Sequence, residues 1–328
     1  TQQAKEWDPP HITPKVRLIN MVDATAFYVQ QRAWTPVLEL AKKEFNMGKT
    51  KPIYNFYRPL EELKTAFESL AKLGQWIVVI DATSFDAWVR SHEHEYAKSF
   101  IVSQNIAKFL IQYKKTVPLL HPWGTLERSS GDGRMSGEKD TNFGNNVNNV
   151  VDTERSFVEA GRRPPLGYFV NGDDLMMTLE RPMTAKEYEK IASRSYRILN
   201  PDKMWYSKDT AFFSKRVFWL EKGVAKVAYP ISLAINSISY SERDSTIVTA
   251  GKEYTYIATG SIVQNVGEDH PMYDAFAKQV ASLQKYKFKD LDKQRLKEAA
   301  LVFTDRKSYL TEQKGQTKDE AASEAVTT

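Results

Sequence analysis

Three aspartates stand at points where apolar stretches of the sequence end. Asp81 follows the apolar run 76–80 in "WIVVID", and Asp173 and Asp174 lie side by side after "GYFVNG". Adjacent carboxylates repel each other, and each is costly to remove from water. Either water screens Asp173 and Asp174 in an ordinary hairpin turn, or divalent cations offset their charge. Carboxylate-only ligation suits Mg²⁺ or Mn²⁺ rather than zinc, and two such ions clamp the attacking and leaving oxygens of a phosphoryl displacement.

The strands that must carry these carboxylates are readable in the sequence. Residues 77–80 are four consecutive apolar residues of strand-forming type, which predicts a buried strand ending at Asp81. "LGYFV" and "LMMTLE" predict two more strands on either side of "NGDD", since Asn-Gly between apolar runs is a strong hairpin signal. Side by side, these strands would bring Asp81 close to Asp173. A strand end is a rigid place from which to present a ligand.

Helices are predicted around these strands from the spacing of apolar residues. Thr184 with Glu187 three residues later has the spacing of a capping box and predicts a helix start. Residues 1–20 read as extended, residues 210–229 as a further hairpin, and the polar residues 312–328 as disordered. The predicted helices cover residues 24–45, 60–73, 89–115, 140–161 and 184–199, and the part of the chain after residue 229 is predicted to be mainly helical, for example over residues 273–286 and 291–303.

Composition excludes several classes of function. The 328 residues contain no cysteine, which rules out disulfides, thiolate zinc sites and cysteine nucleophiles. Lys and Arg number 46 against 41 Asp and Glu, and this formal charge of +5 favours a polyanionic partner. No apolar run approaches the roughly 18 residues of a membrane-spanning helix.

One further motif, "HEHE" at residues 92–95, invites a metal-site interpretation. Its two histidines are two positions apart, which puts them on different sides of a helix. We therefore expect a solvated helix face. The glycine-rich "RSSGDGRMSG" lacks the Lys-Ser/Thr ending of a nucleotide-binding Walker loop.

Three strings occur in a characteristic order: "DATSFD", "GRMSGEKDTNFGN" and "NGDD". Together they resemble motifs A, B and C of viral RNA-dependent RNA polymerases. The second string is most similar to motif B of positive-strand RNA viruses of the tombusvirus, nodavirus and flavivirus-like kind. The resemblance covers roughly residues 13–220.

The resemblance implies an α+β fold, the right-hand polymerase of fingers, palm and thumb, with an antiparallel palm sheet flanked by helices. Residues 1–75 would be partial fingers with the end of motif F. Residues 76–216 would be the palm with motifs A to E, including a fingers insertion at about 97–128. The thumb would cover residues 217–328, with its tail at 312–328.

The resemblance also implies roles for individual residues. Asp81 and Asp173, assisted by Asp174, would bind two Mg²⁺ or Mn²⁺ ions and support template-directed RNA synthesis from ribonucleoside triphosphates. In the family, the positions of Asp86 and Asn145 bond the ribose 2′-hydroxyl. The remaining nucleotide-binding positions in motif B would be Thr141, Ser136 and Gly137.

Three shorter strings fit the same resemblance. "TPKVRLI" resembles the end of motif F, where Lys15 and Arg17 would hold the triphosphate. "LNPDKMW" resembles motif D, where Lys203, with Lys208 in reserve, would protonate the departing pyrophosphate. The alternative interpretation of "TPKVRLI" is a basic edge strand, and that of Lys203 is an ordinary surface lysine. For the third string, described next, the alternative is a plain amphipathic hairpin. "AFFSKRVF" resembles motif E, which would grip the primer RNA through Phe213, Ser214 and Lys215.

The implied partners are an RNA template, the nascent strand and ribonucleoside triphosphates. The upstream part of motif F and motif G have no counterpart, so we expect a fragment, a processed product or half of a split enzyme, completed by an N-terminal segment or other viral replication proteins. The implied location is the host cytoplasm, in membrane-associated replication complexes. A reverse transcriptase and a non-catalytic RNA-binding subunit stay open as alternatives. Asp86 with Asn145 argues against the reverse transcriptase, because deoxyribonucleotide enzymes block the 2′-position.

Overall fold

The chain folds into two compact units, each described here by itself. The first comprises Thr1–Tyr54 and Ser69–Lys208, and the second Asn55–Glu68 and Asp209–Thr328. This division does not test the predicted boundaries of fingers, palm and thumb, which stay predictions. The computed structural model describes residues 2–8, 11–18, 24–44, 53–54, 60–120, 124–128, 131–134, 138, 140–201, 204–239, 251–284 and 287–297.

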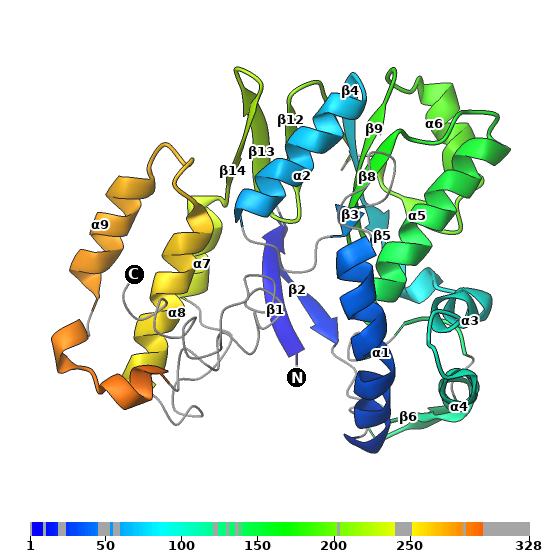
Figure 1. The fold of residues 1–328 in the computed structure, drawn as a ribbon, viewed down its shortest axis with the longest axis horizontal. Coiled ribbons are helices and arrows are strands. Elements are labelled where there is room, and N and C mark those ends of the chain that lie inside the picture. The colour runs from blue at the N-terminus through cyan, green and yellow to red at the C-terminus, as the bar shows by residue number, and fades with distance from the viewer. Residues whose placement is uncertain are drawn as a thin grey trace. The chain divides into compact units, whose positions relative to one another are not determined.

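A five-stranded sheet is the centre of the first unit (Figure 1). Its central strands carry continuous apolar runs because both of their faces are covered, as predicted for residues 77–80. The pairing is antiparallel except at one edge, where β3 runs parallel to β8. The strand order is β11 (Trp205–Ser207), β4 (Trp76–Ile80), β9 (Asp174–Leu179), β8 (Gly167–Asn171) and β3 (Ile53–Tyr54).

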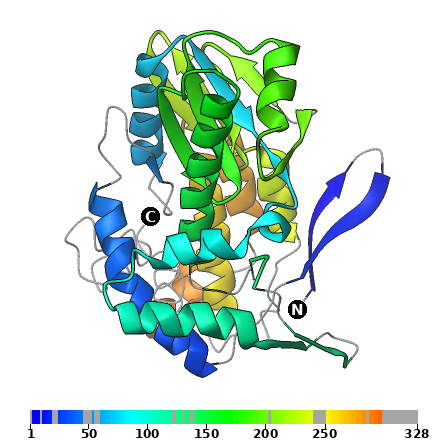
Figure 2. The same cartoon turned by 90° about the vertical axis from the view of Figure 1, so that its right-hand side faces the viewer.

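Helix α5 (Thr141–Glu159) lies along this sheet and contacts β8 (Figure 2). Its inner face is buried almost completely, and Phe143 packs against Trp34 of α1 (Ala24–Glu44) with ring centroids 5.5 Å apart. Both helices occupy the ranges predicted from apolar spacing. The first unit also contains the two-stranded sheets β1–β2 (Gln2–Asp8, His11–Leu18), β5–β10 (Ala82–Thr83, Ile198–Leu199) and β6–β7 (Pro118–Leu120, Leu126–Arg128).

Two predicted helices differ from the structure. The helix predicted over residues 89–115 is two helices, α3 (Ser91–Lys98) and α4 (Gln104–Thr116), because the Ser103 side chain caps a new helix start by accepting from the Ile106 amide. The helix predicted over residues 184–199 begins at the predicted Thr184–Glu187 capping box but ends at Ala192, as α6 (Ala185–Ala192). Tertiary contacts override its helical pattern, because Asp152 accepts the Ser195 hydroxyl and the Tyr196 amide, and β10 pairs with β5.

The second unit begins with the first part of α2 (Leu60–Leu73) and contains a small sheet and several helices. The hairpin predicted at residues 210–229 is three strands, β12 (Thr210–Phe213), β13 (Arg216–Glu221) and β14 (Val224–Ala228). The second turn arises because Lys222 and Gly223 both adopt positive φ angles, 52° and 82°, as a type I′ turn requires. Helices α7 (Ile231–Ser239), α8 (Gly251–Val266) and α9 (Tyr273–Leu283) follow and share an apolar core around Ala234, Val266 and Phe276.

None of the helices within the described residues is both long enough and apolar enough to cross a bilayer. The predicted tail, residues 312–328, lies outside the described residues.

Candidate active site

The tight turn between β8 and β9 carries the paired aspartates. Asn171 and Asp174 are cross-strand partners, so Gly172 and Asp173 form the two-residue loop. Of these two, only Gly172 has a positive φ, 68°, which is the pattern of a type II′ turn and not of the type I′ turn that Asn-Gly suggests. Asp173 therefore stands at the tip and Asp174 at the first position of β9.

Three asparagines of α5 hold this turn, and sequence reasoning missed all three. Asn142, Asn146 and Asn149 follow one another at helical spacing and so share one face of α5. Asn146 accepts the Gly172 amide through its side-chain oxygen, and Asn149 donates to the Asp173 carbonyl at 2.9 Å. The signal was present in "TNFGNNVNNV", because amides repeated along one face of a buried helix need buried partners.

Asp81 lies at the same end of the strands as the β8–β9 turn. Ile80, the last residue of β4, pairs with Leu175, so Asp81 and Asp174 occupy the next positions on neighbouring antiparallel strands. The Asp81 carbonyl accepts the Asn200 amide at 3.0 Å, which fixes the backbone on its other side. The predicted convergence of strand ends is confirmed at the level of the backbone.

The side chains do not gather as closely as the backbone. Within the described residues, no three carboxylate or histidine side chains are grouped so that they could jointly hold a metal ion. The donor chemistry nevertheless fits Mg²⁺ or Mn²⁺, since all three candidates are carboxylates on adjoining strand ends. Asp81, Asp173 and Asp174 are thus a fitting ligand set in type and in strand register, without a formed three-ligand cluster.

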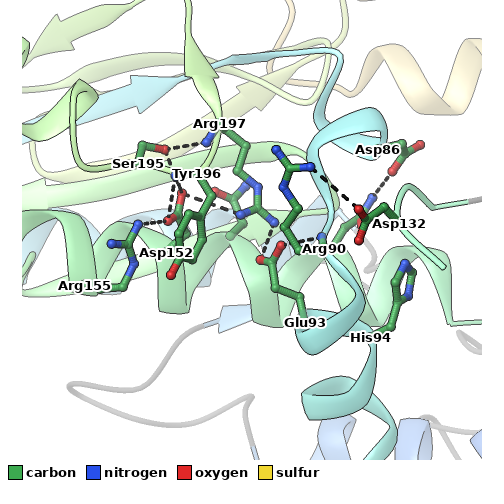
Figure 3. A network of polar contacts seen from close by, with 12 residues as sticks. Asp86, Arg90, Glu93, His94, Asp132, Asp152, Arg155, Ser195, Tyr196 and Arg197 are labelled. Atoms are coloured by element: carbon green, nitrogen blue, oxygen red, sulfur yellow. Dashed lines mark hydrogen bonds and ion pairs between the residues drawn. The ribbon is translucent and has the colours of Figure 1, made fainter. Parts of the chain in front are cut away.

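Asp86 and Asn145, predicted to recognise the ribose, are brought together. Asn145 donates to the Asp86 carboxylate at 2.6 Å, the bond drawn at Asp86 in Figure 3. Asp86 comes from the short helix η1 (Phe85–Trp88) and Asn145 from α5. The buried side-chain oxygen of Asn145 has no hydrogen-bond donor among the described residues. Thr141, one turn earlier, donates its hydroxyl to the Glu138 carbonyl at the start of α5.

A network of polar side chains around Asp152 and Arg197 lies to the left of Asp86 in Figure 3. Arg197 is 4% exposed; it donates to Glu93 at 2.6 Å and lies 3.7 Å from Asp152. Asp152 also accepts the Ser195 hydroxyl at 2.7 Å. A pocket with about 370 Å³ of empty space, part of it open to solvent, lies beside this network, and its lining includes Asp173, Asn149, Asp152 and Arg197.

The interpretation of "HEHE" as a solvated helix face is wrong for half of the motif. Glu93 is 7% and His94 is 2% exposed, because Glu93 pairs with Arg197 and the His94 Nε2 lies 2.7 Å from the Gly133 carbonyl oxygen. Burial, followed by the charge of Arg134, lowers the pKa of His94 to about 2, so His94 is neutral at physiological pH. His92 lies on another side of α3, against Tyr196, as its spacing predicted.

The remaining predicted residues are distributed as follows. Phe213 is 1% exposed and packs against Phe218, which makes it a core residue of the second unit. Ser214 and Lys215 form the β12–β13 turn with positive φ angles, and their contact with RNA stays a prediction. Lys208 lies over the Trp76 ring at 5.2 Å.

Five predicted positions lie wholly or in part outside the described residues. Ser136, Gly137 and Lys203 lie outside the described residues. Lys15 and Arg17 belong to β2 by their backbone, but their side chains lie outside the described part. Their roles stay predictions.

Comparison with solved structures shows that the fold is similar to that of viral RNA-dependent RNA polymerases. The chain resembles two crystal structures, the RNA-dependent RNA polymerase of a human picobirnavirus and its insertion-loop deletion mutant. The deletion mutant matches with a TM-score of 0.69 and 17% identity over 98% of this chain. The other structure matches with a TM-score of 0.66 and 19% identity over 94% of this chain. The chain spans 63% and 58% of the lengths of those two proteins.

At these identities the two structures show the fold alone. A comparison with curated proteins gave no match. The family model for viral RNA-dependent RNA polymerases matches residues 75–326, which include every strand of the five-stranded sheet except β3. The chain therefore belongs to the viral RNA-dependent RNA polymerase family.

Proposed function

We propose that the chain catalyses template-directed synthesis of RNA from ribonucleoside triphosphates during replication of a viral genome. The observation that carries this proposal is the register of β4 and β9, which puts Asp81 next to the Asp173–Asp174 turn. Family membership supports the same activity. Because the chain spans less than two thirds of the picobirnavirus polymerases, the activity of the whole enzyme is part of the proposal.

In this proposal the aspartates bind the metal ions and the asparagines of α5 position the turn. Asp81, Asp173 and Asp174 would hold two Mg²⁺ or Mn²⁺ ions, which supply Lewis-acid stabilisation of the phosphoryl transfer when bound. Asn149 and Asn146 keep the turn in place through the Asp173 carbonyl and the Gly172 amide. This rigidity matters because catalytic groups must already be placed when charge develops.

Asp86 and Asn145 would select the ribose. The Asn145 oxygen, which lacks a donor among the described residues, could accept a 2′-hydroxyl, and the Asp86 carboxylate lies one hydrogen bond away. A site that pairs with a substrate hydroxyl rejects the analogue without it, because the partners are then left unpaired. This argument favours ribonucleotides and does not favour a reverse transcriptase.

Two finer assignments belong to the same proposal. The organisation into fingers, palm and thumb is supported by the similarity to the picobirnavirus polymerase fold. The tombusvirus, nodavirus and flavivirus-like affinity is supported only by the string "GRMSGEKDTNFGN". Association with other replication proteins and a membrane-associated location in the host cytoplasm are proposals that rest on the resemblance.

The test is primer extension on an RNA template with labelled ribonucleotides and Mg²⁺ or Mn²⁺. The unmodified protein should extend the primer, and Asp173→Asn should abolish extension while folding normally. Asp274→Asn, an equivalent change at an exposed position of α9, should extend as the unmodified protein does. Full extension by Asp173→Asn would contradict the proposed role of the turn.

A further inference from the structure

Two separate elements carry the pair that faces the ribose, and something must hold those elements at a fixed spacing. Asp86 belongs to η1, and Asn145 belongs to α5. Their bond is 2.6 Å long and N–H···O bonds extend to about 3.2 Å, so a relative shift of the two elements by about 1 Å would break it. Arg134, a residue to which neither the family resemblance nor the proposed function gives a role, contacts both elements.

The backbone of Arg134 is bound to η1. Its amide donates to the Asp86 carbonyl at 2.8 Å, and the Gly133 amide donates to the Val89 carbonyl at 2.7 Å. His94 supports the same backbone from α3, since its Nε2 lies 2.7 Å from the Gly133 carbonyl oxygen. These bonds tie the residue that carries the Asp86 carboxylate to the segment 133–134.

The side chain of Arg134 is bound to α5. Its Nη1 donates to the Asp140 carbonyl at 2.9 Å, at the start of the helix. With the Asn148 amide oriented to satisfy its neighbours, the Asn148 oxygen accepts from Nη2 at 3.2 Å. The guanidinium therefore joins the N-cap residue of α5 to Asn148, eight positions further along.

Gly144, the residue before Asn145, is what lets the guanidinium approach so closely. A Cβ atom added at Gly144 would lie 1.6 Å from the Arg134 Nη1 and 2.5 Å from its Cζ. The side chain of Arg134 is fully buried at this contact. The Arg134 guanidinium thus occupies the space that a side chain at position 144 would fill, directly beside Asn145.

Neighbouring charges stabilise the buried guanidinium. Asp140 lies 3.9 Å from Arg134 and 3.5 Å from Lys98. Burial alone would raise the pKa of Asp140, but the charges of Lys98 and Arg134 lower it to about 2. Asp140 is therefore ionised at physiological pH and offsets the arginine charge.

We propose that Arg134 is a positioning residue that sets the spacing between Asp86 and Asn145 and thereby determines the preference for ribonucleotides over 2′-deoxyribonucleotides. This inference rests on the proposed function. Arg134 does not touch the nucleotide; it acts through the two side chains that would.

Two substitutions test the proposal, each with a matched control. Arg134→Lys keeps the backbone bond to Asp86 and the positive charge but loses the planar donor fork. Gly144→Ala keeps Arg134 and displaces its guanidinium. Arg163→Lys makes the first change at a side chain that is 88% exposed. Gly260→Ala makes the second at a helical glycine with nothing within 4 Å of the added Cβ.

The measurement is kcat/KM for a ribonucleotide and for its 2′-deoxy counterpart in primer extension, alongside thermal unfolding. We expect Arg134→Lys and Gly144→Ala to lower the ribonucleotide value about ten- to a hundredfold, as for a small misplacement of binding groups. The 2′-deoxyribonucleotide value should stay near that of the unmodified protein. Both controls should keep the original ratio.

An equal fall for both nucleotides, or no change in the ratio in a variant that folds, would overturn the proposal and leave Arg134 a purely structural residue. If Arg134→Lys does not fold, Gly144→Ala decides alone, because it keeps every charged residue of the cluster and changes only the position of the guanidinium. Failure of the proposed function is a different result: the unmodified protein then incorporates neither nucleotide.

Discussion

At the scale of single residues, the asparagines of α5 are the feature that most directly links folding to the candidate chemistry. An aspartate at the tip of a two-residue turn has few constraints of its own. Asn149 supplies them by donating to the carbonyl oxygens of Gly172 at 3.3 Å and Asp173 at 2.9 Å. The helix thus constrains the backbone from which the Asp173 carboxylate projects.

Replacing Asn149 with alanine removes both donors and leaves two carbonyls of the turn without this partner. We expect a loss of about 1–3 kcal/mol in unfolding free energy, the usual cost of buried unsatisfied groups. We also expect about a ten- to hundredfold fall in kcat, as for a displaced catalytic group. Chemical denaturation and primer extension measure the two effects. Asn236→Ala, at an exposed position of α7, is the control, and an unchanged kcat in Asn149→Ala would show that the turn holds its position without the helix.

At the scale of secondary-structure elements, α3 shows how one motif serves two environments. Glu93 is buried and forms its 2.6 Å ion pair with Arg197, whereas Glu95, two positions later, forms a 2.7 Å pair with Lys115 on the surface. Both side chains of the Glu95 pair are more than 40% exposed. The two bonds are almost equally short, but their surroundings differ.

This difference predicts losses of stability of very different size for the same substitution at the two positions. Glu93→Ala leaves the buried Arg197 charge with one partner fewer and should cost about 3–5 kcal/mol in unfolding free energy. Glu95→Ala removes a solvated pair and should cost about 0–1 kcal/mol. Chemical denaturation of both variants makes the comparison. Equal losses would mean that the burial of Glu93 carries no energetic weight.

The same helix shows where sequence reasoning stops. Strands 76–80, 167–171 and 174–179 could be predicted because each is a continuous apolar run with a turn signal or a charge at its end. The positions of Asp81, Asp173 and Asp174 at the strand ends could then be predicted as well. Burial of Glu93 could not be predicted, because its partner Arg197 is 104 positions away in the chain. The end of α6 at Ala192 has the same kind of cause. The Tyr196 amide donates to the carboxylate of Asp152, which lies on α5, 44 positions away in the chain.

The second unit offers a test of an element held by charge. Asp269 binds Lys64 of α2 at 2.8 Å and Lys226 of β14 at 3.0 Å, and also accepts the Val227 amide. Burial alone would raise the pKa of Asp269, but its bonds to Lys64 and Lys226 lower it below the usual value. Asp269 therefore connects the start of α2 to the three-stranded sheet.

Because the pKa of Asp269 is lower in the folded than in the unfolded state, its stabilisation is complete above the unfolded value of about 3.9 and disappears as the pH falls through the folded value. Asp269→Asn should therefore lower stability by about 1–3 kcal/mol at pH 7. The difference from the unmodified protein should shrink below about pH 4. Urea denaturation across this pH range measures it, with exposed Glu268→Gln as the control. A difference that persists at the lowest pH would mean that the carboxylate charge is not the cause.

At the scale of the whole molecule, fold similarity extends further than sequence similarity. Only 17% of positions are identical to the picobirnavirus deletion mutant, yet 98% of this chain aligns with a TM-score of 0.69. The three motif strings are short, so most of this likeness must be carried by apolar patterning, which many sequences satisfy. That explains why the strands of the five-stranded sheet could be predicted from the chain alone and the contacts of buried charges could not.

The net charge of +5 makes the last prediction one for the entire chain. A replication enzyme must hold RNA mainly through phosphates, and each neutralised phosphate releases counterions. With about four such contacts on single-stranded RNA, the slope of log K against log salt is about −3, and binding weakens about fiftyfold between 50 and 200 mM salt. Fluorescence anisotropy with a labelled RNA measures this dependence.

Asp173→Asn should bind RNA at least as tightly as the unmodified protein, because it removes a negative charge, while failing to extend a primer. Salt-independent binding would argue against phosphate contacts, and RNA binding without any metal-dependent extension by the unmodified chain would point to a non-catalytic RNA-binding subunit.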